Sequence, residues 1–264
     1  MAEPWPSDVA EALTGRQDLD AFTRLEYYAD VASTNDIALA RANAGAPEGL
    51  SVLADLQRAG RGRRGRSWFS PPGAGLYLSI VTQPPRERLP VVTLVAGLAG
   101  ARAVTAVTGL PVRLKWPNDL VVGTRWQKLG GVLCEGAASG AVVMGIGINL
   151  RPAAYPPDVA DRATSIEGEL GRPAERGALV VALLAAVRAG VSRLRDEPGH
   201  AWVRDAWREL AAPGSLGARV RWTDAAGDRR GLARDIDVDG ALLVDADGRR
   251  ERIIAGEVTW ERRP

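Results

Sequence analysis

Apolar and polar positions change their period several times along the chain, and the changes mark out strands and helices. Alternating or short continuous apolar runs predict strands at residues 24–29, 50–57, 75–82, 112–122, 128–137 and 141–150. Helical spacing predicts helices at residues 33–45, 91–109, 174–194 and 200–210. Strands and helices of this length, intermixed along the chain, favour an α/β (α+β) fold with a mixed β-sheet flanked by helices.

The pattern changes again at Gly214. Short apolar alternations separated by Gly and Asp predict four or five small strands that close a barrel-like domain of about 50 residues. We therefore expect an N-terminal segment at residues 1–23, a main α/β domain at 24–212 and a small C-terminal β domain at 213–264.

Composition is that of a soluble globular protein. The chain has 264 residues, 46% hydrophobic and 25% charged, which is too apolar for a disordered protein and long enough for one core and a small appendage. The formal net charge is only +2. This charge argues against a general nucleic-acid-binding protein, which usually carries a broad basic excess.

Nothing in the sequence indicates export or a membrane span. The N-terminus has no basic start followed by an apolar core. The longest uncharged apolar stretches, Leu89–Ala101 and Ala178–Val187, are shorter than the roughly 20 residues that cross a bilayer. The single cysteine, Cys134, cannot form an internal disulfide. We expect buried helices and a cytoplasmic protein.

A loop rich in glycine and arginine, Ala59–Ser70, fits two phosphate-binding signatures. Gly60, Gly62 and Gly65 spell G-x-G-x-x-G, and the same stretch nearly matches a Walker A loop. Both signatures require a helix directly after the loop, whereas Pro71-Pro72-Gly73 predicts a turn here. What remains is an arginine loop between two strands. It suits a ligand that bears phosphate or carboxylate, although an isolated arginine run is more often only solvated.

Four other motifs accompany this loop. "STND", "QRAGRGRRGRSW", "KWPND", "KLGGVL" and "GIGIN" occur in this order, and together they resemble the motif set of the biotin protein ligases. The resemblance covers nearly the whole chain from about Leu25, including a "GEV" near the end. It implies a class II synthetase-like catalytic fold followed by an SH3-like β domain. It also implies that biotin and ATP form biotinyl-5′-adenylate and pyrophosphate, and that biotin then passes to a lysine of a biotin carboxyl carrier domain.

The resemblance also assigns site residues. It implies that biotin contacts Ser33, Thr34, Asn35, Gln57, Arg61 (through its backbone), Gly62, Arg63, Lys128, Gly131 and Gly145. It implies that ATP and the adenylate contact Arg63, Arg66, Trp68, Lys115, Asn118 and Asn149, with Trp68 and Asn149 on the adenine side. The catalytic residues would be Lys128, Arg63, Arg66 and Lys115, and Asn118 would help to seat Mg²⁺, which binds mainly through phosphates.

This chemistry fits the residue types. A carboxylate must approach an α-phosphate, so the site needs fixed cations more than it needs a nucleophile. Lys128, which we expect to be buried beside Leu129, would meet the biotin carboxylate and later polarise the acyl carbonyl. The Arg151–Ala163 loop would cover the adenylate and exclude water.

Several residues have plainer alternatives. Ser33-Thr34-Asn35 fits a helix N-cap as well as a ureido site. Asp119 is more typical of a cap or turn residue than of a group that deprotonates the incoming lysine. Cys134 and His200 would suit a Cys-His hydrolase, but an apolar strand and a helix start favour structural roles. The turn between Asp119 and Lys128 is longer than the family motif leads us to expect.

Three other functions remain possible at this point. A lipoate- or octanoate-transferring enzyme of the same fold would need an apolar channel in place of the polar cluster. A nucleic-acid-binding module would use the arginine loop, and a biotin-sequestering protein would not need the cations. About 23 residues precede the first strand, too few for a helix-turn-helix module, so we expect a ligase without repressor activity, either monomeric or homodimeric.

Overall fold

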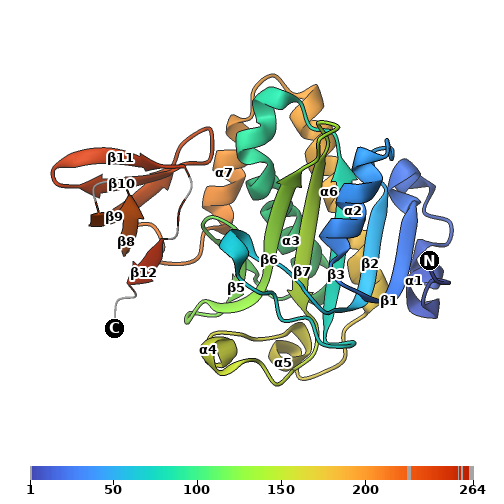
Figure 1. Ribbon diagram of the computed structural model, residues 1–264. Coiled ribbons are helices and arrows are strands. Elements are labelled where there is room, and N and C mark those ends of the chain that lie inside the picture. The colour runs from blue at the N-terminus through green and yellow to red at the C-terminus, as the bar shows by residue number, and fades with distance from the viewer. Residues whose placement is uncertain (1, 225–226, 255, 257, 262–264) are drawn as a thin grey trace.

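The larger part of the chain is built on a seven-stranded mixed sheet. The computed structural model describes residues 2–224, 227–254, 256 and 258–261. The strand order is β1-β2-β3-β7-β6-β5-β4 (Figure 1). The bounds are β1 Leu25–Val31, β2 Ser51–Gln57, β3 Gly75–Thr82, β4 Arg113–Lys115, β5 Asp119–Val122, β6 Gln127–Gly136 and β7 Val142–Asn149. Only β1 and β2 pair in parallel, and the other neighbours are antiparallel. The predicted mixed sheet is confirmed.

Helices cover both faces of this sheet. On one face lies α2 (Thr34–Asn43), and on the other lie α3 (Val92–Thr108), α6 (Arg176–Asp196) and α7 (Ala201–Leu210) (Figure 1). Alternate strand residues therefore enter different cores, as Tyr27 and Tyr28 do. The smaller core lies under α2, and it is on this face that the strands leave room for a ligand.

The two longest apolar helical segments are core elements. Arg86–Thr108, which joins the 3-10 helix η3 (Arg86–Val91) to α3, and α6 are long and apolar enough to cross a bilayer by length and composition. However, 72% of the apolar window in the first segment is buried inside the protein, and half of that in α6. Their apolar character is thus accounted for by packing on the sheet and on each other.

Residues 2–23 are not a mere extension. They form α1 (Ser7–Leu13) and the 3-10 helix η1 (Gln17–Thr23), which pack against α6. Val9 and Leu19 are buried in the main core. The sequence analysis predicted no helix here, yet Val9 and Leu13 have the i, i+4 spacing of one apolar helix face.

The predicted 112–122 strand is in fact two strands. β4 and β5 form an antiparallel pair, and the turn between them contains a cis Trp116-Pro117 peptide. Proline has no N–H for a strand ladder, which explains why pairing stops there. As a result, the polar residues of "KWPND" gather at a turn in the middle of the segment.

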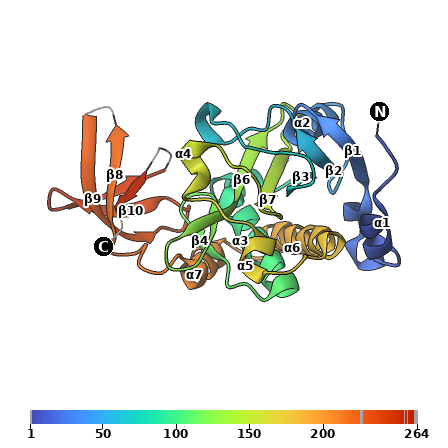
Figure 2. The same ribbon diagram turned by 90° about the horizontal axis from the view of Figure 1, so that it is seen from below.

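The C-terminal domain is a five-stranded antiparallel sheet of order β11-β10-β9-β8-β12. Its strands are β8 Arg219–Asp224, β9 Gly227–Ile236, β10 Leu242–Ala246, β11 Arg249–Ile253 and β12 Thr259–Glu261. The predicted number of strands is confirmed. The domain lies at the β4 end of the large sheet, opposite the N-terminal helix (Figure 2). Of the "GEV" motif, Glu257 lies outside the described residues.

Candidate active site

One cavity of about 1150 Å³ opens on the α2 side of the sheet. It is bordered by the start of α2, the loop after β2, the β4–β5 turn, β6, β7 and the C-terminal domain. Every site residue expected from the sequence lines this cavity: Ser33, Thr34, Asn35, Gln57, Arg61, Gly62, Arg63, Arg66, Trp68, Lys115, Asn118, Lys128, Gly131, Gly145 and Asn149. The motifs are far apart in sequence, and the fold brings them together.

Two glycines of β7 form part of the cavity floor. A Cβ on Gly145 would lie 2.2 Å from Asn35 Oδ1, and one on Gly147 would lie 2.7 Å from the Trp68 indole. Only glycine permits both approaches. The Lys128 ammonium lies over the Trp68 ring, 5.4 Å from its centroid. The Trp68 Nε1 is buried without a hydrogen-bond partner among the described residues.

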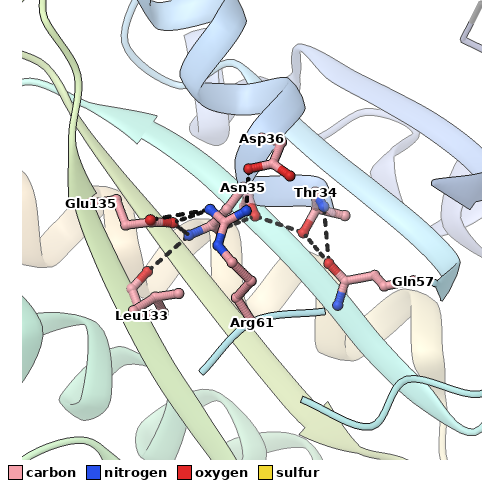
Figure 3. Close-up of polar contacts among 8 residues, drawn as sticks. Thr34, Asn35, Asp36, Gln57, Arg61, Leu133 and Glu135 are labelled. Carbon is pink, nitrogen blue, oxygen red and sulfur yellow. Dashed lines mark hydrogen bonds and ion pairs between the residues drawn. The ribbon is translucent and has the colours of Figure 1, made fainter. Parts of the chain in front are cut away.

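A neutral polar cluster occupies one end of the cavity (Figure 3). The Thr34 hydroxyl and backbone N–H both donate to Gln57 Oε1, at 3.1 and 2.9 Å. The Ser79 hydroxyl lies 2.7 Å from Thr34 Oγ1 and 2.6 Å from Asn35 Oδ1. Ser33 occupies the N-cap position of α2 but makes no capping hydrogen bond, so its buried hydroxyl is available to a ligand. The N-cap interpretation therefore holds for the position of Ser33 but not for its side chain.

The Arg61 guanidinium is held by two carboxylates. It pairs with Asp36 of α2 and with Glu135 of β6, the latter at 2.8 and 3.1 Å. These carboxylates, Asp36 first, raise the pKa of Arg61. The Arg61 side chain is thus engaged within the protein, and the contact of its backbone with biotin stays a prediction.

The opposite end of the cavity is cationic. Lys128 Nζ lies 2.5 Å from one oxygen of Asp119, and Lys115 Nζ lies 3.8 Å from the other. The Lys128 side chain is 38% exposed, so the expectation that it is buried is wrong. Asp119 takes the place of the expected anion as the partner of Lys128. The longer turn after Asp119 does not prevent this contact.

Arg63 has no such carboxylate partner among the described residues. Burial lowers the pKa of its guanidinium, the charge of Arg64 lowers that pKa further, and Asp119 raises it. Half-burying a cation without a hydrogen-bonded anion costs free energy, and an incoming anion would recover that cost. The arrangement is that of an anion site.

Two asparagines hold backbone in place. Asn118 Nδ2 donates to the Val132 carbonyl at 2.8 Å, which leaves Oδ1 as the atom available to a cation. Asn149 Nδ2 donates to the carbonyls of Lys128 and Thr164, at 3.3 and 2.8 Å. Asn149 therefore links β6 at Lys128 to the end of the Arg151–Ala163 segment at Thr164.

The predicted cover, Arg151–Ala163, lies at the mouth of the cavity and contains the short helix α4 (Pro157–Ala160). Its C-terminal end is tied to β6, because Lys128 N–H donates to the Arg162 carbonyl at 2.5 Å and Thr164 N–H donates to Lys128 O at 3.0 Å. Near its middle, the Tyr155 ring meets Phe69 of the arginine loop edge to face at 6.2 Å. After the cover, α5 (Ile166–Leu170) begins at the N-cap Ser165.

The sequence analysis missed several residues of the site. Ser79 and Glu135 support the polar cluster from behind the cavity lining. Trp126 and Trp260 line the cavity and pack edge to face at 6.1 Å, and Trp260 belongs to the C-terminal domain. A lone carboxylate inside the β6 pattern was the only sequence signal for Glu135. Nothing in the sequence placed Trp260 near the catalytic domain.

The Cys-His alternative is not supported. Burial raises the pKa of the Cys134 thiol to about 12. The His200 ring instead contacts Arg88 at 2.8 Å and Asp239 at 3.4 Å. A thiol so weakly acidic is a poor nucleophile.

Comparison with family models gives two matches. Residues 28–150 match the biotin/lipoate A/B protein ligase family, and residues 215–259 match the biotin protein ligase C-terminal domain. These ranges contain all the motifs described above and most of the C-terminal sheet.

Individual proteins agree with these matches. A biotin--[acetyl-CoA-carboxylase] ligase of Mycobacterium tuberculosis is 36% identical over 89% of this chain and 88% of its own length. The bifunctional ligase/repressor BirA of Bacillus subtilis is 31% identical, over 89% of this chain and 73% of its own length. The biotin protein ligase of Aquifex aeolicus, solved with biotin and ATP, superposes with a TM-score of 0.78 at 26% identity, over 91% of this chain and 99% of that one. The chain belongs to the biotin protein ligase family.

Proposed function

We propose that this protein is an ATP-dependent biotin protein ligase. In the first step a biotin carboxylate oxygen attacks the α-phosphorus of ATP, and pyrophosphate leaves. In the second step the amine of an acceptor lysine attacks the acyl carbon, AMP leaves, and the amine loses a proton. The observation that carries the proposal is one cavity whose neutral polar end and cationic end are joined along β6.

The polar end suits the ureido ring of biotin. That ring has one acceptor and two donors, so it needs a donor and acceptors placed within an otherwise apolar wall. The free Ser33 hydroxyl provides a donor, and the remaining lone pair of Thr34 Oγ1 provides an acceptor. Gly145 and Gly147 let the Asn35 amide and the Trp68 indole lie against β7, and the indole forms an apolar wall.

The cationic end suits the triphosphate. Arg63, Arg66 and Lys115 would contact phosphate oxygens and stabilise the charge that builds on them during displacement. Lys128 would exchange Asp119 for the biotin carboxylate and later polarise the acyl carbonyl. No covalent bond to the enzyme is required.

Magnesium would act together with the phosphates. Among the described residues no group of three or more His, Cys, Asp or Glu side chains is arranged to hold a metal ion. This agrees with the preference of Mg²⁺ for phosphate oxygens and water. Asn118 Oδ1 is the protein atom that would complete its shell. When bound, the ion neutralises phosphate charge.

The adenylate is a mixed anhydride that water destroys. The Arg151–Ala163 cover, fastened by Asn149 and Lys128, would shield it until the acceptor arrives. The acceptor is a biotin carboxyl carrier domain of a biotin-dependent carboxylase. We further propose a cytoplasmic location and a monomer or homodimer.

The other functions explain fewer observations. A lipoate-transferring enzyme has no use for the hydrogen-bonded cluster of Thr34, Gln57 and Ser79. A protein that only sequesters biotin has no use for the lysines held at Asp119. A nucleic-acid-binding module does not account for an arginine loop that is tied to α2 and β6.

A competition experiment tests the proposal. The protein is incubated with Mg-ATP and equal amounts of biotin and lipoate, and the adenylates are identified by mass spectrometry. Lys128→Ala is run in parallel, with Arg195→Ala as a control because Arg195 pairs with Glu48 outside the cavity. We expect biotinyl-adenylate from the parent and the control and a sharp loss with Lys128→Ala. A lipoyl adduct alone would contradict the substrate, and the absence of any adduct would contradict the activity.

Transfer is then tested with an isolated carrier domain. The chain contains two lysines, Lys115 and Lys128, both in the cavity. Biotin found on the carrier lysine is therefore easily distinguished from self-labelling of the enzyme.

A further inference from the structure

Glu135 lies behind the cavity wall and contacts two residues of the polar cluster. It is near the end of β6, its side chain is 29% exposed, and it does not itself line the cavity. Its carboxylate accepts hydrogen bonds from Asn35 and from Arg61 (Figure 3). An ordinary surface ion pair contributes little to stability, so the importance of Glu135 depends on what these two contacts position.

The first contact fixes the orientation of the Asn35 amide. Nδ2 donates to Glu135 Oε2 at 2.7 Å and to the Leu133 carbonyl at 3.3 Å. A carboxylate only accepts, so the amide nitrogen must face Glu135 and the amide oxygen must face Ser79. With both amide hydrogens engaged, Asn35 offers its surroundings an acceptor.

The orientation of the Asn35 amide affects the hydroxyl groups next to it. Asn35 Oδ1 and Thr34 Oγ1 both lie within hydrogen-bond distance of the single Ser79 hydroxyl hydrogen. The Thr34 hydroxyl hydrogen is in turn directed to Gln57 Oε1. The acceptor at position 135 thus orients the Asn35 amide and through it the Ser79 hydroxyl, while Gln57 Oε1 is held in addition by the Thr34 N–H.

The second contact fixes the arginine loop. Two nitrogen–oxygen contacts join Arg61 to Glu135, and Asp36 holds the same guanidinium from α2. A guanidinium held by two carboxylates has a defined position. The adjoining backbone at Gly60 and Gly62 is thereby held at the edge of the cavity.

We propose that Glu135 is a positioning residue for biotin, which sets the hydrogen-bond pattern of the ureido site through Asn35 and anchors the arginine loop through Arg61. This inference rests on the proposed function. It predicts that a change at position 135 weakens biotin more than ATP. Glu135 contacts the Asn35 amide of the ureido site directly, whereas Lys128 is roughly 20 Å away along β6 and Arg63 and Arg66 are reached only through the loop backbone.

The test compares Glu135→Gln and Glu135→Asp with the parent. Glutamine has the same shape but can donate to Asn35 Oδ1, so the amide of Asn35 loses its single orientation. Aspartate still only accepts, but it is one methylene shorter. The matched control is Glu26→Gln, which removes a carboxylate that pairs with Arg41 of α2 away from the cavity. Biotin affinity is measured by calorimetry with biotin alone, KM for ATP by adenylate formation, and stability by thermal unfolding.

We expect Glu135→Gln to weaken biotin about tenfold or more, the cost of a disrupted charge-assisted hydrogen bond, and to change KM for ATP less than about twofold. Glu135→Asp should fall between the parent and Glu135→Gln, which keeps the test usable if the glutamine variant folds poorly. Unchanged biotin affinity would overturn the inference. So would a parallel loss of biotin affinity, ATP affinity and melting temperature.

Double-mutant cycles test whether Glu135 acts on biotin binding through Asn35 and Arg61. If Glu135 acts through its two neighbours, the effect of Glu135→Gln on biotin affinity should shrink when Asn35→Ala or Arg61→Ala is already present. Full additivity in both cycles would overturn the inference. A parent protein that binds no biotin would instead contradict the proposed function, so the two failures are distinguishable.

Discussion

At the scale of single residues, the site depends on how closely side chains approach the β7 backbone. Gly145 has ordinary strand geometry, so its importance comes from space and not from backbone conformation. Its position lies directly under the Asn35 amide. Any side chain at this position would push Asn35 away from Ser79 and Glu135.

Gly145→Ala should therefore weaken biotin binding by about tenfold or more and lower the free energy of unfolding by about 1–3 kcal/mol, as overpacking does. The added Cβ would lie 2.2 Å from Asn35 Oδ1. Calorimetry with biotin and thermal unfolding measure the two effects. Gly136→Ala is the control, because a Cβ at Gly136 on β6 meets nothing within 4 Å. Equal effects from the two substitutions would contradict the argument.

The site residues could be named from the sequence because five motifs in order resemble those of a known family. The partners of these residues within the fold could not be predicted. The alternation along β6 does not tell that Glu135 faces Asn35, a residue 100 positions away. Nor does sequence spacing reveal that Asp119 takes up both lysines, because that contact depends on the β4–β5 turn and the β6 register.

At the scale of elements, the two loops around the cavity are joined by one aromatic contact. Phe69 belongs to the arginine loop and Tyr155 to the cover, and their rings meet edge to face. Burial raises the pKa of the Tyr155 hydroxyl. Phe69 is 39% exposed, so the contact closes the cavity at its rim.

Phe69→Leu or Tyr155→Leu should each speed the loss of biotinyl-adenylate to solvent by roughly two- to tenfold, since an aromatic pair contributes about 0.5–1.5 kcal/mol. The loss is followed after a single turnover without acceptor. The double variant should be little faster than either single variant. If the two effects multiply, the rings act independently and the pair does not hold the cover closed. Tyr28→Phe serves as the control, because Tyr28 contacts Glu26 and Arg41 outside the cavity.

The four longer helices, α2, α3, α6 and α7, and most strands could be predicted from the length of their apolar segments and from the residues that begin and end them. The short α1 could not, since seven residues give only one apolar pair, Val9 and Leu13. The contact between the loops was also beyond prediction. Loops carry no period, and their approach is decided by the elements that they connect.

At the scale of the whole molecule, the C-terminal domain is attached next to the cationic end of the cavity. The indole of Trp116, 2% exposed, donates to the Gly240 carbonyl at 2.9 Å, and Gly240 lies in the turn between β9 and β10. Asp239 of the same turn contacts His200, and Arg208 of α7 pairs with Asp235. Trp116 lies between Lys115 and Asn118 in the sequence. The residue that docks the C-terminal domain therefore also helps to position Lys115 and Asn118.

Trp116→Phe keeps an aromatic ring but leaves the Gly240 carbonyl without its donor. We expect the free energy of unfolding to fall by about 1–3 kcal/mol, the cost of an unsatisfied buried polar group. KM for ATP should rise while the Kd for biotin stays the same, because the polar cluster lies at the other end of β6. Trp202→Phe is a matched control, since the buried Trp202 Nε1 has no hydrogen-bond partner among the described residues and its ring packs on Arg193. If Trp116→Phe lowers stability without raising KM for ATP, the contact at this turn attaches the domain but does not influence ATP binding. If KM rises, docking of the C-terminal domain helps to place Lys115 and Asn118 for the phosphates.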